Sequence, residues 1–234
     1  MAVHGLYGDW ESTWTDPDSN SLWLRDFIPS QFPNTKLRIG SFGYDSATAF
    51  TNSVSDIDDA AKALINALDG ERQSKNSRRK PIILIAHSLG GLVVKQVWHK
   101  GQKRCSNMQE RANQSIQAMN LANERSELWA DIIDSIFGII LFAVPHCGAS
   151  AASFTTVTAN VHRLAPLGFA VNKVTVEALS RNSEKFWQVS IAFIQPASKV
   201  RIIRSFYETI KIANHLVSRI SRTRSVPAGR FRLM

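Results

Sequence analysis

The chain has 234 residues, which suits one α/β domain or at most two small ones, and its 44% of hydrophobic residues excludes a wholly disordered protein. Its formal net charge is +9, and residues 199–234 carry most of it, with nine Lys or Arg side chains against the single acid Glu208. Because the rest of the chain is near neutral, a folded nucleic-acid-binding face is not expected. The basic end is instead a solvated tail or a contact for an anionic surface.

The chain begins with a short apolar segment and a turn. Met1, Ala2 and Val3 precede the segment H-G-L-Y-G, in which His4 and Gly5 mark the turn. A buried strand usually has about five residues. The sequence therefore predicts either a short first strand or a chain that has lost its beginning.

The segments that follow predict a loop, a short helix, a strand and a long helix. Residues 10–22 are polar and turn-rich, and residues 23–29 have the pattern of a short helix. Apolar side chains in residues 37–42 predict a strand. Residues 55–70 combine a capping-box-like start, apolar side chains at helical spacing and a closing glycine, Gly70, which together predict a helix.

The strongest pattern in the chain runs from Pro81 to Val94. Residues 82–85 form an unbroken apolar run, as in a parallel strand that is covered on both faces. The run ends in A-H-S-L-G, with Ser88 at the tip of a tight turn, and an apolar helix to about residue 100 follows. A strand, a sharp serine-bearing turn and a helix make the nucleophile elbow of α/β-hydrolases. The alternative is a strand-to-helix turn that contains a serine by chance, since Ala86 replaces the first glycine of G-x-S-x-G.

The second half of the chain repeats the alternation of strands and helices. The expected segments are a polar insertion at 101–123, a buried strand at 135–144, a mostly helical stretch at 151–193 and a third buried strand at 200–206. This alternation predicts an α/β fold with a mostly parallel central sheet and helices on both faces. We expect the domain to span residues 1–209, with the basic residues 210–234 as a tail outside the core.

Cysteine use and hydropathy bear on location and cofactors. The two cysteines, Cys105 and Cys147, are too few for a disulfide framework and lack the spacing of metal ligands. We therefore expect a reducing, intracellular location and no cofactor or metal. The start of the chain lacks a secretory signal, and the longest apolar run, residues 136–145, is too short to span a bilayer.

Six segments resemble, in order and spacing, one family of proteins. They are V-H-G-L-x-G followed by T-W, W-L-R-D-F-I-P-x-x-x-P-N, F-G-Y-D-S, I-A-H-S-L-G-G-L-V-V-K-Q, G-I-I-L-F-A-V-P-H-x-G and S-F-Y-E-T. From Ala2 to Thr209 the chain resembles the fungal branch of the serine-active-site-containing protein family, α/β-hydrolases allied to lipases and serine esterases. The resemblance implies hydrolysis of carboxylic esters, lipids among them, and association with mitochondrial or endoplasmic-reticulum membranes.

The elbow and the first turn supply two parts of a catalytic site. Ser88 is the candidate nucleophile. The backbone N–H of Leu89, directly after it, is one candidate oxyanion donor, and the backbone N–H of Leu6, just past the histidine–glycine turn, is the second. Acyl transfer further needs a base that takes the serine proton and a carboxylate that holds the base.

The acid is expected at the end of the strand that follows the one ending near Pro145, because the order in this fold is nucleophile, acid, histidine. Glu208, in S-F-Y-E, stands at that place. The alternative is that Glu208 is a surface carboxylate at the start of a loop. Asp45 and Asp134 lie before or between the expected elements and are ranked lower.

No histidine stands where the base is expected. The resemblance implies a D-H-containing segment near the end of the domain, and none follows Thr209. His215 is the only histidine after Glu208 and is a weak candidate for the base, because seven positions leave little room for the chain to cross a strand and return. His99 and His162 precede Glu208, whereas the base of this fold is expected after the acid. The resemblance implies structural or supporting roles for His4, His87 and His146.

Both ends of the chain thus depart from the family pattern, as a gene product truncated at both ends would. Two functions remain open: a serine esterase or lipase, and a hydrolase-like interaction or signalling module without turnover. A third interpretation is an anionic-surface binder that acts through its tail. The expected partners are an ester or lipid substrate and a peripheral membrane contact, with no specific nucleic acid.

Overall fold

The computed structural model of the chain describes residues 1–51, 54–73, 80–99, 129–144, 173–197, 199–208 and 220–226. The predicted insertion at 101–123 and most of the tail at 210–234 lie outside these residues. The first part of the helical stretch predicted at 151–193 also lies outside them.

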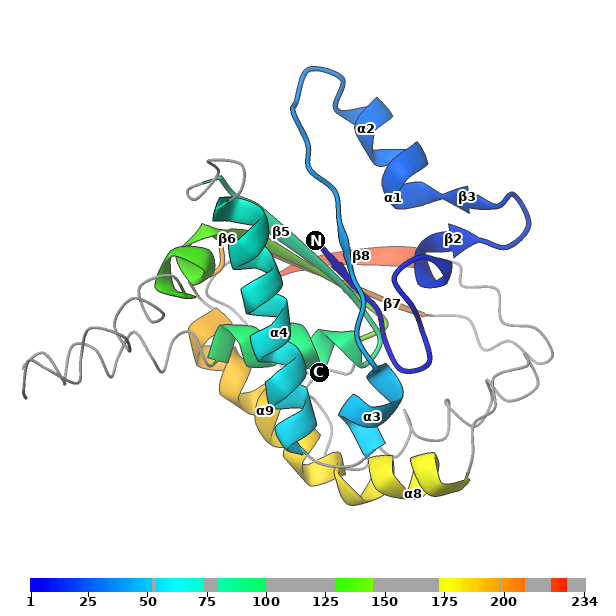
Figure 1. Cartoon of the computed structure of the whole chain (residues 1–234), viewed down its shortest axis with the longest axis vertical. Helices are drawn as coiled ribbons and strands as arrows, with labels where there is room; N and C mark the ends of the chain where they lie inside the picture. Colours follow the sequence, from blue (N-terminus) through cyan, green and yellow to red (C-terminus); the bar gives the residue numbers. More distant parts are fainter. Residues whose placement is uncertain are drawn as a thin grey trace, which may run out of the picture.

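One sheet organises the fold, with the strand order β4-β1-β5-β6-β7-β8 (Figure 1). The five parallel strands are β1 (Ala2–Val3), β4 (Ser41–Phe42), β5 (Ile82–His87), β6 (Ile136–Phe142) and β7 (Ile202–Glu208). The sixth, β8 (Ile220–Val226), pairs antiparallel with β7. The predicted α/β fold with a mostly parallel sheet is confirmed. Strand β8 adds to the sheet a segment that the sequence analysis assigns to the tail.

The helices connect the strands, and a small ribbon of two antiparallel strands, β2 (Thr15–Asp16) and β3 (Ser21–Leu22), lies between η1 and α1 in the chain. The helices are η1 (Ser12–Trp14), α1 (Trp23–Asp26), α2 (Ile28–Gln31), α3 (Ser46–Thr51), α4 (Val54–Gln73), residues 90–99, residues 129–135, α8 (Lys173–Arg181) and α9 (Ser183–Ala197). None of the described helices has the length and apolar character needed to cross a membrane.

The end of α4 differs from the prediction. The sequence places the helix end at Gly70, whereas α4 continues to Gln73. A Cβ atom at Gly70 would meet no atom within 4 Å, so this glycine lies on an open helix face. A glycine at a helix end is useful only where the backbone turns left-handed. At Gly70 the backbone stays helical.

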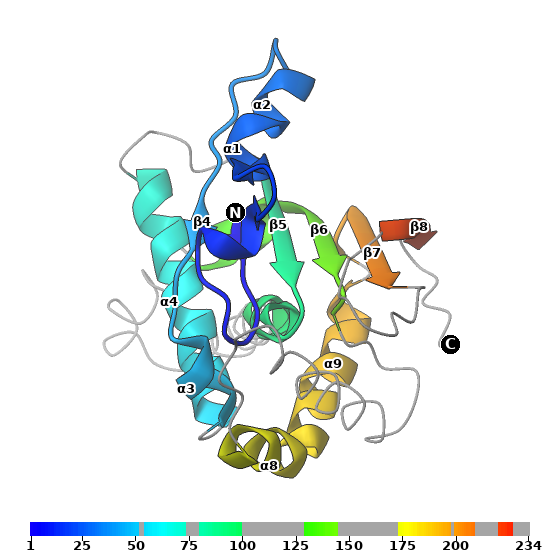
Figure 2. The same cartoon turned by 90° about the vertical axis from the view of Figure 1, so that its right-hand side faces the viewer.

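The main core lies between one face of the sheet and the long helices. Figure 2 shows α4, α8 and α9 on one side of the sheet and α1 and α2 on the other. Strand β5 alternates, so that Ile82, Leu84 and Ala86 are buried in the main core. On the opposite face Ile83 is 48% exposed. The prediction that both faces of this strand are covered is therefore wrong at Ile83.

A smaller core covers part of that second face. Trp14 and Leu24 are buried there with Ala2, and the partly buried Ile85 and Ile39 pack against them. The segment from η1 to α1 thus covers the sheet near β1. Both residues of β1 are almost fully buried although the strand is short, because β4 and β5 pair with it on either side.

Candidate active site

Ser88 occupies a sharp turn between β5 and the helix at residues 90–99. Its φ is 51°, in the left-handed region that residues other than glycine rarely adopt. The Ser88 N–H donates to the carbonyl of Phe142 at 2.8 Å, and the Gly91 N–H donates to the Ser88 carbonyl at 3.1 Å. Hydrogen bonds on both sides therefore hold the serine in its strained conformation. Strain of this kind is concentrated at functional sites, and a nucleophile elbow requires it.

Two glycines let the elbow and the first turn touch. A Cβ at Gly5 would lie 2.8 Å from the Ser88 Cβ and 2.9 Å from the His87 carbonyl. A Cβ at Gly90 would lie 2.7 Å from the Val3 carbonyl oxygen. No larger side chain fits at either position, so the turn after β1 packs directly on the elbow.

Ala86, the departure from the G-x-S-x-G pattern, costs the elbow nothing. It is a fully buried residue within β5, and it pairs with Val3 of β1. Its methyl group fits the core at that position. The close approaches that demand glycine occur instead after the serine, at Gly90 and at Gly91, where a Cβ would collide with the Val144 side chain.

The two candidate oxyanion donors come from these adjacent turns. A Cβ at Gly5 would lie 3.4 Å from the backbone nitrogen of Leu89, which shows how near the first turn is to the elbow. Outside helices and strands, no hydrogen bond between described backbone groups uses the N–H of Leu6 or of Leu89. Backbone N–H groups beside a nucleophile are the usual donors to a developing oxyanion.

His4 holds the first turn in place. Its ring is almost fully buried, and its Nδ1 lies 3.0 Å from the Gly5 carbonyl oxygen. The Tyr44 N–H donates to His4 Nε2 at 3.4 Å, which assigns the proton to Nδ1 and makes Nδ1 the donor to Gly5. Burial lowers the pKa of His4, although the bond to Gly5 and the charge of Asp9 oppose that shift. The ring therefore favours its neutral form.

This arrangement orients the Leu6 N–H. The Gly5 carbonyl and the Leu6 N–H belong to one planar trans peptide and point in opposite directions. The carbonyl accepts hydrogen bonds from His4 Nδ1 at 3.0 Å and from the Gly8 N–H at 3.1 Å. Fixing the carbonyl on one side fixes the N–H on the other. The family resemblance implies a structural or supporting role for His4, but no pattern in the sequence reveals this contact.

His87 directly precedes Ser88 and packs against an aromatic side chain. Its ring centroid lies 6.4 Å from that of Trp14 in an edge-on arrangement. Burial, and to a lesser extent the nearby His4, lowers the pKa of His87. His4 uses both ring nitrogens on backbone groups, so it has none left for the Ser88 hydroxyl.

The register of the sheet places Glu208 at the edge that carries the elbow. His87 pairs with Phe142, which pairs with Phe206, so the carboxyl ends of β5, β6 and β7 lie level. Glu208 is two residues further along β7, and its backbone pairs with Ile220 of β8. It is thus the last residue of a strand, on the same edge as Ser88.

Of the two lower-ranked acids, Asp45 follows β4 at the same edge of the sheet as Ser88, and Asp134 lies at the opposite edge. Asp134 is exposed in the helix at residues 129–135, which leads into the amino end of β6, at the opposite edge of the sheet. Asp45 is exposed, and its carbonyl accepts the Ala49 N–H at the start of α3. His99 ends the helix at residues 90–99, whereas the elbow precedes that helix. The remaining histidines, His146, His162 and His215, lie outside the described residues. Within the part of the chain that the structure describes, no group of three His, Cys, Asp or Glu residues forms a metal site.

Comparison with known families agrees with this arrangement. The sequence model of the family described as "Putative serine esterase (DUF676)" matches residues 1–165. The chain belongs to this family. The match covers the turn after β1 and the elbow, and it ends before β7 and Glu208. Membership confirms the α/β-hydrolase class expected from the sequence.

One relative supports the same assignment at a greater distance. Protein SERAC1 of Danio rerio is 25% identical over an alignment of 173 residues that covers 66% of this chain and 23% of that protein. The chain therefore matches less than a quarter of that relative's length. The expected resemblance to the serine-active-site-containing protein family is confirmed. No solved structure matches the chain.

Proposed function

We propose that this member of the serine esterase family hydrolyses carboxylic esters, with Ser88 as the nucleophile and the N–H groups of Leu6 and Leu89 as the oxyanion donors. The observation that carries the proposal is the left-handed φ of 51° at Ser88, in a turn that the Gly5 backbone touches. A serine held in this way projects from the end of its strand toward a substrate.

The chemistry follows the usual acyl-transfer sequence. The Ser88 Oγ attacks the ester carbonyl carbon and gives its proton to a base, while the carbonyl oxygen becomes an oxyanion that Leu6 and Leu89 stabilise. Collapse of this intermediate breaks the bond to the alcohol, which leaves with the proton. Water then attacks the acyl-serine and releases the carboxylic acid. Each N–H is worth about 10²–10³ in rate.

Glu208 is the proposed acid of this site, because it ends the second strand after the one that carries the elbow. Neutralising it without changing its shape, as in Glu208→Gln, should lower kcat strongly. Removal of the acid from such a triad typically costs about 10⁴ in rate. The neighbouring Arg204→Gln on the same strand is the matched control and should keep most of the activity.

A lipid ester is the proposed substrate, and peripheral contact with a membrane follows from it. This part rests on the family resemblance and on the exposed apolar side chains of the segment before β4, namely Trp10, Phe27, Phe32 and Leu37. Comparing kcat/KM for p-nitrophenyl esters of short and long acyl chains tests it. A preference for the short chain would contradict a lipid substrate.

A specific observation favours a second function. The two described histidines nearest to Ser88 do not offer a base: His4 uses both ring nitrogens, and His87 packs against Trp14. The alternative is therefore a hydrolase-like interaction module without turnover. Loss of the base would leave only the residual acceleration of about 10³–10⁴ over water that binding and the oxyanion hole supply.

One experiment separates the two functions. A fluorophosphonate probe should label the wild-type chain and not Ser88→Ala, while the control Ser180→Ala should be labelled like wild type. Labelling together with turnover of p-nitrophenyl esters supports the esterase. A folded wild-type chain that is not labelled and does not turn over the esters would rule out the esterase and would support the interaction module.

A further inference from the structure

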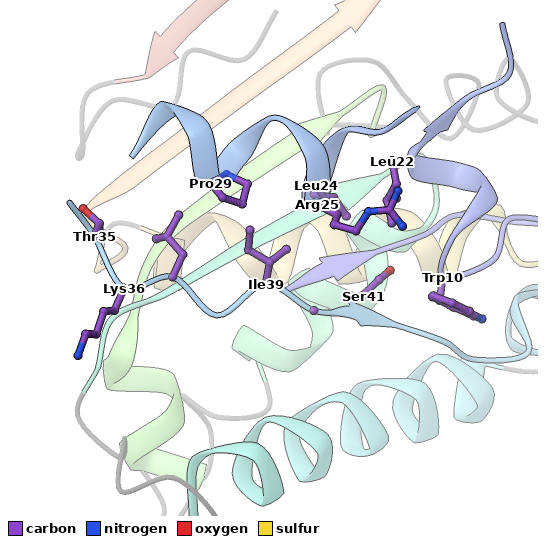
Figure 3. Close-up of a pocket in the computed structure, with 11 residues that line it drawn as sticks. Trp10, Leu22, Leu24, Arg25, Pro29, Thr35, Lys36, Ile39 and Ser41 are labelled. Atoms are coloured by element: carbon purple, nitrogen blue, oxygen red, sulfur yellow. The ribbon is translucent and has the colours of Figure 1, made fainter. Parts of the chain in front are cut away.

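A groove lies between the projecting helices α1 and α2 and the extended segment that leads into β4. Figure 3 shows Leu24 and Pro29 on one wall facing Ile39 on the other. The groove encloses about 730 Å³, and its remaining lining residues are Trp10, Leu22, Arg25, Thr35, Lys36, Leu37, Gly40 and Ser41. This volume lies within the range of about 300–1,000 Å³ that small-molecule sites occupy. Ser88 is not among the residues that line the groove.

The lining is mostly aliphatic, and its polar atoms are few. The Ser41 hydroxyl is already used, because it accepts the Trp14 indole N–H at 3.0 Å. A peptide in such a groove would leave its backbone groups without partners, at a considerable energetic cost. A hydrocarbon chain has no such groups. The composition of the walls therefore favours an aliphatic ligand.

Exposed apolar side chains gather around the same groove. Four of the six large hydrophobic side chains that are exposed among the described residues belong to this part of the chain, namely Trp10, Phe27, Phe32 and Leu37. Trp10 and Leu37 also line the groove. A concentration of this kind marks a binding surface.

The charged residues of the lining indicate the charge of the ligand's polar end. Arg25 and Lys36 are its only charged residues, and both are cations. Arg25 pairs with Asp26 at 2.7 Å. Lys36 has no acidic partner among the described residues, and in Figure 3 it stands at one end of the groove, with Trp10 at the other. The groove is thus apolar along its length and cationic at one end.

We propose that this groove binds a single long-chain amphiphile with an anionic head group. The hydrocarbon chain lies between the two walls, and the head group, a carboxylate or a phosphate, lies at Lys36. A bilayer surface would need a broad flat face, whereas a groove with two walls encloses one chain. Binding does not require Ser88, so it stands or falls independently of the esterase activity.

Titration of the full chain with sodium oleate, below the concentration at which oleate forms micelles, tests this proposal by calorimetry. Saturable binding of one oleate is expected, with a change in tryptophan fluorescence from Trp10. Leu37→Gln should weaken binding about fivefold to tenfold, because it removes apolar contact. Ile191→Gln, a matched change at an exposed isoleucine of α9, should leave the affinity unchanged. Ser88→Ala should also bind like wild type.

A comparison of a charged and a neutral ligand tests the assignment of the head group to Lys36. Lys36→Glu should weaken oleate binding about tenfold and hardly affect oleyl alcohol, which is neutral. Lys185→Glu on α9 is the matched control, and Lys36→Gln serves if Lys36→Glu folds poorly. Equal loss with both ligands would overturn the assignment of the head group to Lys36.

Three further results would overturn the groove itself. One is the absence of saturable oleate binding to the folded wild-type chain. Another is sedimentation of the chain with phosphatidylglycerol vesicles, unchanged in Leu37→Gln, without binding of monomeric oleate. That second result would indicate docking on a lipid surface in place of capture of one chain. Equal weakening by Ile191→Gln would show unspecific adsorption and would overturn the groove as well.

Discussion

His4 and Tyr44, forty positions apart in the chain, hold each other by two hydrogen bonds and a stacked ring contact. The Tyr44 hydroxyl donates to the His4 carbonyl at 2.9 Å, the Tyr44 N–H donates to His4 Nε2 at 3.4 Å, and the ring centroids are 4.5 Å apart. The second bond leaves the proton on Nδ1, which donates to Gly5. Tyr44 follows β4, the neighbour of β1 in the sheet, and its contacts with His4 hold the turn after β1 in place.

Removing the hydrogen bonds of the His4 ring should impair catalysis more than binding. In His4→Phe the ring remains but the donor to Gly5 is lost, so the Leu6 N–H is no longer held toward the oxyanion. We expect kcat to fall by about tenfold to a hundredfold, with KM nearly unchanged, since loss of a whole oxyanion donor costs about 10²–10³. Steady-state kinetics on a p-nitrophenyl ester measures both constants.

The conservative change His4→Gln is the control for this prediction, because its amide can still donate to the Gly5 carbonyl. It should recover part of the lost kcat. A kcat in His4→Phe equal to that of wild type, in protein of unchanged thermal stability, would show that the ring only fills space.

Because of the strain at Ser88, two variants that both lack the nucleophile should differ in stability. A left-handed conformation costs a residue with a Cβ roughly 1–2 kcal/mol, and glycine is free of this cost. Ser88→Gly should therefore be more stable than Ser88→Ala by about 1 kcal/mol in urea denaturation, while neither reacts with a fluorophosphonate. Equal stabilities of the two variants would mean that the turn relaxes without its serine.

The presence of most long strands was predictable because it depends on local signals. The apolar runs of β5, β6 and β7 and the serine-bearing turn are each contained in a few consecutive residues. The exposure of Ile83 was not predictable, because four apolar residues in a row do not reveal which face the rest of the chain covers. The contact of His4 with Tyr44 joins distant segments, and no pattern within either segment specifies it.

The ends of elements were harder to predict for a related reason. Gly70 has the residue type of a helix end, yet α4 continues past it to Gln73, because a glycine ends a helix only where the backbone turns left-handed. Strand β8 lies in a basic segment that composition alone assigns to a tail. Pairing with β7 adds it to the sheet, and pairing is a property of two segments.

Substitutions at Gly90 and at Gly70 should change the stability of the chain in opposite directions. Gly90→Ala brings a Cβ to within 2.7 Å of the Val3 carbonyl, so we expect a loss of about 2 kcal/mol or more in the free energy of unfolding. Gly70→Ala meets no atom within 4 Å and should gain about 1 kcal/mol, because alanine favours the helix. Urea denaturation of both variants checks the signs. Destabilisation by Gly70→Ala would contradict an open helix face.

The two histidines beside the elbow predict a loss of stability in acid. Burial lowers the pKa of His4 and of His87 below the value of about 6.5 expected in the unfolded chain. Above that pH both are neutral in either state, and the stability is fully present. As the pH falls below about 6.5, the unfolded chain takes up protons that the folded chain does not. Stability then falls by at most about 1.4 kcal/mol per pH unit for each histidine, until the folded-state pKa is reached.

Thermal unfolding between pH 7.5 and pH 5 measures this effect. The melting temperature should fall through that range, and the fall should be smaller in His87→Phe. Lys185→Gln, a change at an exposed position of α9, is the control and should keep the wild-type slope. A melting temperature of His87→Phe that falls as steeply as that of wild type would exclude His87 as a source.

A buried lysine joins the helix after the elbow to α9. Lys95 Nζ donates to the Ser190 hydroxyl at 3.0 Å, and both side chains are almost fully buried. Ser190→Ala removes an acceptor from a buried ammonium group and should lower the free energy of unfolding by about 1–3 kcal/mol. Replacing both residues, as in Lys95→Met with Ser190→Ala, removes the charge as well, and a well-packed apolar pair is often as stable as the polar one.

The double variant should therefore be at least as stable as Ser190→Ala alone. A double-mutant cycle built on urea denaturation gives the coupling between the two residues, which should lie at about 0.5–3 kcal/mol for groups in direct contact. Because Lys95 belongs to the helix that begins directly after the elbow, labelling of Ser88 in each variant shows whether the pair also fixes the nucleophile. Additive effects in the cycle would mean that the hydrogen bond contributes nothing specific to the packing of this helix on α9.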